Sequence, residues 1–70
     1  MSARIRDRLR PEDEGDLYGT LEGASAKLDG MLKERRAREW LVSQIDDEGG
    51  RSYKVSDEKG RLVAIYYIEE

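Results

Sequence analysis

The chain has 70 residues, of which 41% are charged, and a formal net charge of −3. A chain of this length forms one domain at most and buries only about 60% of its unfolded surface, so it is marginally stable alone. Cysteine and histidine are both absent, which excludes disulfides, thiolate or imidazole zinc sites, cysteine nucleophiles and histidine-based triads. Association is the remaining way to stabilise so small a fold, so we expect a homodimer or a protein partner.

The first eleven residues carry four arginines at alternate positions, Arg4, Arg6, Arg8 and Arg10. The alternation is compatible with a short strand, but chain ends are usually loose. We therefore expect a flexible basic arm over residues 1–11 and one small domain over residues 12–70. No apolar run stands at the N-terminus, and no stretch approaches about 18 apolar residues. We expect no signal peptide and no membrane span, and the lack of cysteine fits a cytoplasmic protein.

A helical pattern begins at Leu17, after Pro11 and a group of acidic residues that are typical of a helix start. Apolar residues then recur at spacings of three and four and fall within an arc of roughly 100°, the width of a core-facing stripe. These residues are Leu17, Leu21, Ala24, Leu28, Met31 and Leu32. The pattern predicts one long amphipathic helix over residues 16–46.

The end of this helix has two possible structures. In the first, the helix continues to Asp47 and stops at Gly49-Gly50, because glycine adopts positive φ freely. In the second, residues 40–45 form a strand and residues 46–50 form a hairpin loop. Good helix formers in this stretch favour the helix, and the strand stays open as the alternative.

The C-terminal third predicts an antiparallel hairpin with strands over residues 51–57 and 61–69. Seven consecutive apolar or aromatic residues, Leu62 to Ile68, favour the second strand. The fold class is therefore α+β, with a long helix followed by a hairpin. A two-stranded hairpin is marginal in water, and its second strand is too apolar for a lasting edge. We expect dimerisation to complete the fold, either between these strands or between helices.

Two kinds of residue are candidates for a protein interface. Aromatic residues and the outward face of the last strand offer anchors that bury a large area. Glycines at helical spacing, opposite the leucine stripe, would let another helix approach closely. The candidate interface residues are Trp40, Tyr53, Val63, Ile65, Tyr67, Gly19, Gly23 and Gly30. The alternative for the glycines is that they lie in a loop and at the helix start.

Basic residues suggest a second kind of partner. Contacts to DNA or RNA would involve the N-terminal arm and the basic cluster over residues 33–38, namely Arg4, Arg6, Arg8, Arg10, Arg35, Arg36 and Arg38. On a helix, however, the cluster spreads around the circumference and can form Glu34–Arg38 and Arg35–Glu39 pairs. The low net charge also argues against general nucleic-acid binding.

No catalytic constellation is recognisable. The acidic groups lack the alternate-residue spacing of a calcium loop, and no glycine-rich phosphate loop is present. We expect no enzymatic activity, no metal and no cofactor. The function that remains is a small protein-binding module, a regulator, adaptor or inhibitor that acts by covering a surface. Such composition also suits inhibitors encoded by phages or mobile elements. A DNA- or RNA-binding regulator is the alternative.

Overall fold

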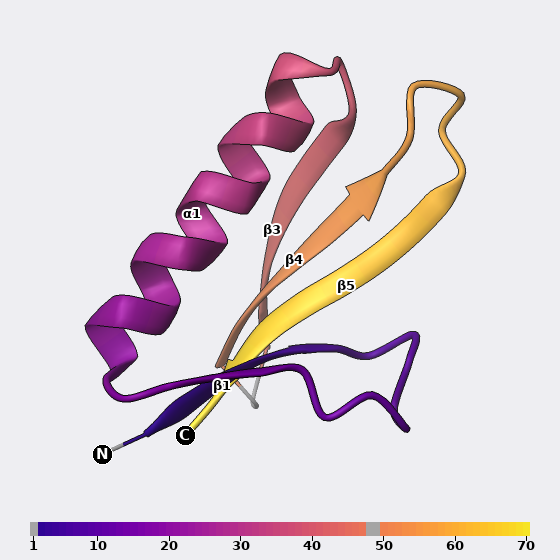
Figure 1. Cartoon of the computed structure of the whole chain (residues 1–70). Helices are drawn as coiled ribbons and strands as arrows, with labels where there is room; N and C mark the ends of the chain where they lie inside the picture. Colours follow the sequence, from indigo (N-terminus) through magenta and orange to yellow (C-terminus); the bar gives the residue numbers. More distant parts are fainter. Residues whose placement is uncertain (1, 48–49) are drawn as a thin grey trace.

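The part of the chain that the structure describes forms one antiparallel sheet of five strands, covered on one face by a single helix (Figure 1). The computed structural model describes residues 2–47 and 50–70. In chain order the elements are β1 (Ala3–Asp7), β2 (Asp16–Tyr18), α1 (Leu21–Ala37), β3 (Leu41–Asp47), β4 (Gly50–Ser56) and β5 (Leu62–Glu69). The α+β class predicted from the sequence is confirmed, although the sheet has three more strands than the predicted hairpin.

The strand order is β2-β1-β5-β4-β3, and every neighbouring pair is antiparallel. The helix carries the chain from β2 at one edge of the sheet to β3 at the other. The last three strands then form a meander that returns β5 to the side of β1. The two ends of the chain are therefore paired at the middle of the sheet, where Ile5 lies opposite Ile68.

The helix is shorter than the predicted range 16–46. Thr20 caps its N-terminus, because the Thr20 side chain accepts a hydrogen bond of 3.0 Å from the Gly23 backbone N–H. At the other end, the N–H groups of Glu39 and Trp40 donate to the Arg36 and Arg35 carbonyls. This pair of bonds is a Schellman motif, which closes a helix with a left-handed residue. Glu39 takes that conformation, with φ of 66°.

Residues 41–47 are a strand, so the preference for a helix in this stretch is wrong and the alternative of a strand is correct. The loop predicted over residues 46–50 is shorter than expected, because β3 continues to Asp47 and β4 begins at Gly50. Residues 48 and 49 of that loop lie outside the described residues. β3 pairs with β4 without interruption, from Leu41 opposite Ser56 to Asp47 opposite Gly50. Successive side chains of β3 lie on opposite faces of the sheet. Val42 packs against the core on the helix side, whereas Leu41 and Ile45 point to the other face.

The flexible arm predicted over residues 1–11 is also corrected, because Ala3–Asp7 form β1 between β2 and β5. Ala3 and Ile5 are buried, and the arginines alternate with them on the opposite face. The alternate spacing of the arginines at this end of the chain therefore reflects the two-residue period of a strand.

The predicted C-terminal hairpin is confirmed, with strands at Gly50–Ser56 and Leu62–Glu69. Asp57 organises the turn between them. Its carboxylate accepts hydrogen bonds from the backbone N–H groups of Lys59 and Arg61, both at 2.9 Å, and from Arg61 Nε at 3.0 Å.

The core lies between α1 and the sheet. Its buried apolar residues come from the three strands β1, β4 and β5 and from the helix: Ala3, Ile5, Ala24, Leu28, Leu32, Val55 and Ala64. The predicted leucine stripe is only partly correct, because Leu28 and Leu32 are buried whereas Leu21 and Leu17 are exposed. Leu17 belongs to β2, and the helix has not yet begun there.

The last strand is completed within one chain. β5 pairs with β1 over residues 66–69 along one edge and with β4 over residues 62–67 along the other, and its Ala64 is fully buried. The expectation that β5 needs a second chain at its edges is therefore wrong. What α1 leaves uncovered is the opposite face of the sheet.

Candidate interaction surface

The face of the sheet opposite α1, here called the open face, collects the side chains that alternate with the core. Strand pairing places them side by side, since directly opposed residues of an antiparallel pair point to the same face. Leu17 lies opposite Arg4, Arg6 opposite Tyr67, Tyr67 opposite Ser52, and Ser52 opposite Ile45. The open face consists of Leu17, Arg4, Arg6, Glu69, Tyr67, Ile65, Ser52, Lys54, Leu41, Ser43 and Ile45.

Exposed apolar side chains occupy both ends of the open face. Leu17 on β2 is 58% exposed, and Leu41 and Ile45 on β3 are 61% and 38% exposed. The middle is better covered, because Ile65 and Tyr67 are half-buried and Ser52 is fully buried between its cross-strand neighbours. The Ser52 Oγ has no hydrogen-bond partner among the described residues.

Tyr67 and the β1 arginines form the polar part of the open face. The Arg8 guanidinium lies over the Tyr67 ring, 5.0 Å from its centroid, which is a cation–π distance. Arg6 forms an ion pair of 3.3 Å with Glu69 and also donates to the Pro11 carbonyl at 2.9 Å. These contacts hold the arginine heads at the edge of the apolar residues.

The structure separates the predicted protein-interface residues. Ile65 and Tyr67 share the open face, and Val63 lies where the register between β4 and β5 shifts. Trp40 and Tyr53 instead pack against the core on the helix side. The glycines do not form one strip: Gly19 precedes the helix, Gly23 is in its first turn and Gly30 is exposed within it.

The predicted nucleic-acid contacts fall into two groups at different ends of the molecule. Arg4, Arg6 and Arg8 adjoin Tyr67, whereas Arg10 forms an ion pair of 2.9 Å with Asp7. The other group, Arg35, Arg36 and Arg38, lies at the C-terminal end of α1, away from β1 (Figure 1). Arg38 is paired there with Glu34 at 2.6 Å, as the helical spacing predicts.

Sequence reasoning missed three apolar members of the open face, namely Leu17, Leu41 and Ile45. Leu17 was assigned to a helix stripe, and the other two belong to the stretch where helix was preferred over strand. Residues 41–45 read apolar, apolar, polar, polar, apolar, which has no strand period, so the local signal for a strand is limited to the β-branched residues Val42 and Ile45.

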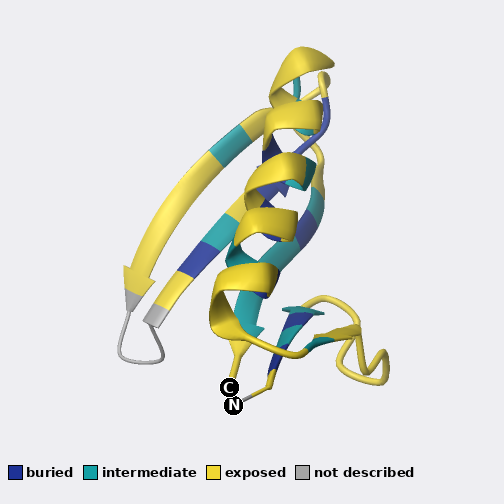
Figure 2. Ribbon diagram, turned by 60° about the vertical axis from the view of Figure 1, so that its left-hand side comes forward, coloured by how far each residue is buried: buried dark blue, intermediate teal, exposed yellow. Residues whose placement is uncertain are grey.

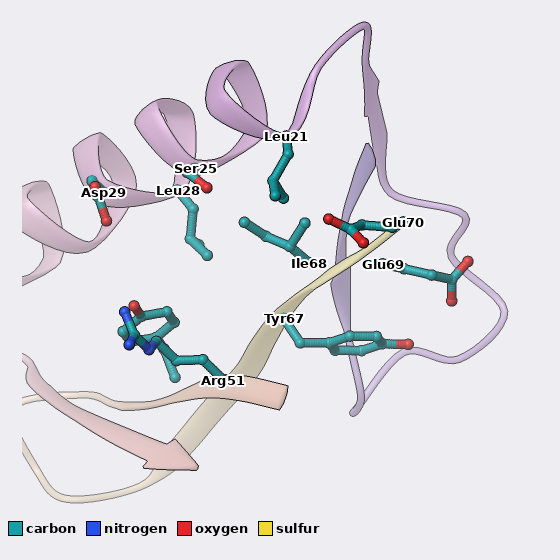
Figure 3. Close-up of a pocket in the computed structure, with 10 residues that line it drawn as sticks. Leu21, Ser25, Leu28, Asp29, Arg51, Tyr67, Ile68, Glu69 and Glu70 are labelled. Atoms are coloured by element: carbon teal, nitrogen blue, oxygen red, sulfur yellow. The ribbon is translucent and has the colours of Figure 1, made fainter. Parts of the chain in front are cut away.

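A second feature is a hollow of about 550 Å³ on the helix side, between the first half of α1 and the ends of β4 and β5 (Figure 3). Leu21, Leu28 and Ile68 form its apolar part, and Figure 3 shows the Arg51 side chain approaching it from β4. Asp29 and Glu70 add carboxylates at its rim, whereas the Glu69 side chain points away from the hollow (Figure 3). The hollow is open to solvent and holds charges of both signs.

Within residues 2–47 and 50–70, no group of three or more acidic side chains is placed to hold a metal ion, and no helix is long and apolar enough to cross a membrane. Comparison with known proteins finds no matching family model, curated protein or solved structure. The open face is therefore the feature of the molecule from which a function can be inferred.

Proposed function

We propose that this chain is a non-enzymatic protein-binding module whose open face docks on an acidic surface of another protein. The observation that supports this most directly is a sheet face with no helix over it, on which exposed apolar residues lie beside arginines and a tyrosine. Tyrosine and arginine are the residue types that most often dominate binding energy at protein interfaces. Leu17, Leu41 and Ile45 provide apolar area around them.

The charge of the open face differs in sign from that of the whole chain. The chain carries a formal charge of −3, whereas the described side chains of the open face include three cations, Arg4, Arg6 and Lys54, and one carboxylate, Glu69. The Arg8 guanidinium also lies over the Tyr67 ring. A basic face on an acidic protein favours docking in one orientation, because a complementary acidic partner is attracted to that face and repelled by the rest.

The size of the open face suits a small occluding module. Five strands about 4.8 Å apart make a face about 20 Å wide, and strands of about six residues make it about 20 Å long. Its area of roughly 400 Å² is about half of the 800 Å² or so that each partner buries in a standard interface. Flanking loops would contribute the remainder. We propose that the protein acts by covering a partner's surface in the cytosol, as a regulator, adaptor or inhibitor.

Nucleic acid is the less favoured partner for two reasons. The chain carries a formal charge of −3, which argues against general binding to the phosphates of a nucleic acid. Single-stranded nucleic acid is usually bound through several stacked aromatic residues, and Tyr67 is the aromatic residue that the described strand pairing places on the open face.

The test uses two exposed leucines on different sides of the sheet. Leu17→Glu adds a carboxylate to the open face, whereas Leu21→Glu makes the same change on α1, where Leu21 is 45% exposed. Affinity capture from cell extract, followed by binding measurements with the captured protein, should show about a tenfold or greater loss for Leu17→Glu. Leu21→Glu should bind as the wild type does.

Equal retention of the same protein by both variants would contradict docking through the open face. If the captured material were instead sensitive to nuclease, and its binding to this chain weakened steeply as the salt concentration rose, the partner would be DNA or RNA and not a protein.

A further inference from the structure

β3 is an edge strand whose outer side no described strand occupies. It spans Leu41–Asp47 and stands last in the order β2-β1-β5-β4-β3. Its pairing with β4 continues without a register shift from one end to the other. Figure 2 shows this strand mostly in the colour of exposed residues, with the β3–β4 hairpin extending away from the helix. An edge of this kind presents a row of unpaired N–H and C=O groups.

The two edges of the sheet differ in how they are protected. β2, at the opposite edge, has only three residues, Asp16–Tyr18, and very short edge strands resist further pairing. β3 has seven residues and contains no proline, lysine or arginine, the usual protective residues at an edge. Its only charges are Asp46 and Asp47 at one end. The row from Leu41 to Ile45 is therefore suited to pairing with another strand.

We propose that the occupant of this edge is β3 of a second copy of the chain, paired antiparallel about a two-fold axis at Ser43. In this register Ser43 meets its own copy, and Leu41 of each chain lies opposite Ile45 of the other. Two exposed apolar residues on each strand then cover one another across the new pair. Pairing residues 41–45 adds about four to six backbone hydrogen bonds and joins the two sheets.

Neighbouring registers are less favourable. With the axis at Gln44, Leu41 would face Asp47 and Val42 would face Asp46 of the other chain, so apolar residues would be opposed by carboxylates. With the axis at Val42, Leu41 would face Ser43, and Ile45 would lose its apolar partner. Only the Ser43 register matches the apolar residues of both strands, because a shift along the strand replaces each cross-strand pair.

Charges near the ends of β3 act in both directions in this register, because Glu39 of one chain comes opposite Asp47 of the other, whereas Asp46 comes close to basic residues. Asp46 of one chain comes opposite Trp40 of the other, and within each chain the Arg35 guanidinium lies over the Trp40 ring at 5.4 Å from its centroid. The acidic end of each β3 thus approaches the basic end of the second helix, where Arg36 and Arg38 also lie. A parallel arrangement would place the acidic ends together.

This dimer shares Leu41 and Ile45 with the open face of the proposed function, but it uses the edge of the sheet and leaves Leu17 and Tyr67 uncovered, so the two proposals can be tested separately. It also differs from the association expected from the sequence, since both edges of β5 are occupied within one chain.

The test exploits the residue that meets its own copy at the two-fold axis. Ser43 is exposed, so Ser43→Lys and Ser43→Glu should each leave the monomer folded, as checked by circular dichroism. Each variant alone opposes like charges across the axis, and its dimer dissociation constant in sedimentation equilibrium should rise about tenfold or more above the wild-type value. An equimolar mixture should recover association as a heterodimer, because lysine then faces glutamate.

Leu17→Lys is the control, since it adds the same charge at the other edge of the sheet and should leave the dimer dissociation constant unchanged. The proposal is overturned if the wild type stays monomeric from micromolar to millimolar concentration. It is also overturned if the mixture fails to associate while both single variants are folded monomers, or if Ser43→Lys self-associates as the wild type does. Loss of partner capture by Leu17→Glu with unchanged self-association would separate the two proposals.

Discussion

Gly15 shows how closely the loop between β1 and β2 is packed. Its φ is +72°, and a β-carbon built there would lie 2.0 Å from the Ile5 carbonyl oxygen, a backbone atom. The Gly15 backbone N–H is also fixed in position, because it donates a hydrogen bond of 2.8 Å to Asp13 Oδ1. Gly30, in the middle of α1, is different: a β-carbon there would meet nothing within 4 Å.

The first prediction compares these two glycines. Gly15→Ala should lower the free energy of unfolding by about 2–3 kcal/mol, because it adds both a backbone clash and a left-handed non-glycine residue. Gly30→Ala should instead raise it by about 1 kcal/mol, since alanine is the better helix former. Urea unfolding of both variants measures the difference, and an equal effect of the two substitutions would contradict the loop packing described here.

Among the secondary-structure elements, α1 shows most clearly why its end could not be predicted. Helices commonly end with a glycine in the left-handed conformation, and the first such signal after the leucine stripe is the pair Gly49-Gly50. The structure ends the helix at Ala37 and places Glu39 in the left-handed position. The sequence therefore contained no local stop, and the choice between helix and strand over residues 40–45 depended on pairing with β4.

The second prediction follows from this unusual cap. Glu39→Gly should raise the free energy of unfolding by about 1 kcal/mol, because glycine avoids the cost of a left-handed β-carbon. Glu39→Ala is the matched control: it removes the carboxylate and keeps the β-carbon, so it should change stability by less than about 0.5 kcal/mol. Thermal and denaturant unfolding would measure both. If the two variants had the same free energy of unfolding, the left-handed backbone conformation of residue 39 would not be a source of instability at the end of α1.

The third prediction concerns the turn between β4 and β5. The backbone N–H of Arg61 holds the pKa of Asp57 below its ordinary value; the Lys59 N–H and the Arg61 side chain act in the same direction, and burial opposes them. A carboxyl with a lowered folded-state pKa stabilises the fold above its unfolded pKa of about 3.9. That stability is lost as the pH falls through the folded-state pKa.

Asp57→Asn should therefore be less stable than the wild type at pH 7, and the difference should narrow as the pH falls below about 4. Chemical unfolding at a series of pH values would measure the narrowing. Glu58→Gln, at the exposed neighbouring residue, is the control and should stay close to the wild type throughout. A constant difference between Asp57→Asn and the wild type would show that the charge of Asp57 is not what stabilises the turn.

At the level of the whole molecule, the parts of the fold predicted correctly are those with dense local signals. The hairpin of β4 and β5 has alternation, a glycine turn and seven apolar residues in sequence. β1 has only Ala3 and Ile5 as buried residues, and its partner strand β5 begins 55 residues after β1 ends. No short stretch of the sequence contains both strands of this pair. The position of β1 between β2 and β5, and with it the open face, therefore could not be predicted from local sequence patterns.

The last prediction distinguishes a structural β1 from a flexible arm. Ile5 is 5% exposed and belongs to the core cluster, so Ile5→Ala should lower the free energy of unfolding by about 2–4 kcal/mol. The total free energy of unfolding of a domain of this size is roughly 4–10 kcal/mol, so the variant should unfold at a much lower urea concentration than the wild type.

Leu9→Ala, at a 44% exposed leucine just after β1, is the control and should change the free energy of unfolding by less than about 0.5 kcal/mol. Trp40 fluorescence and circular dichroism would follow both transitions. Because β1 pairs with β5, the lower stability of Ile5→Ala should appear in the single unfolding transition of the whole domain. Equal free energies of unfolding for the two variants would indicate that residues 1–11 are a flexible arm after all.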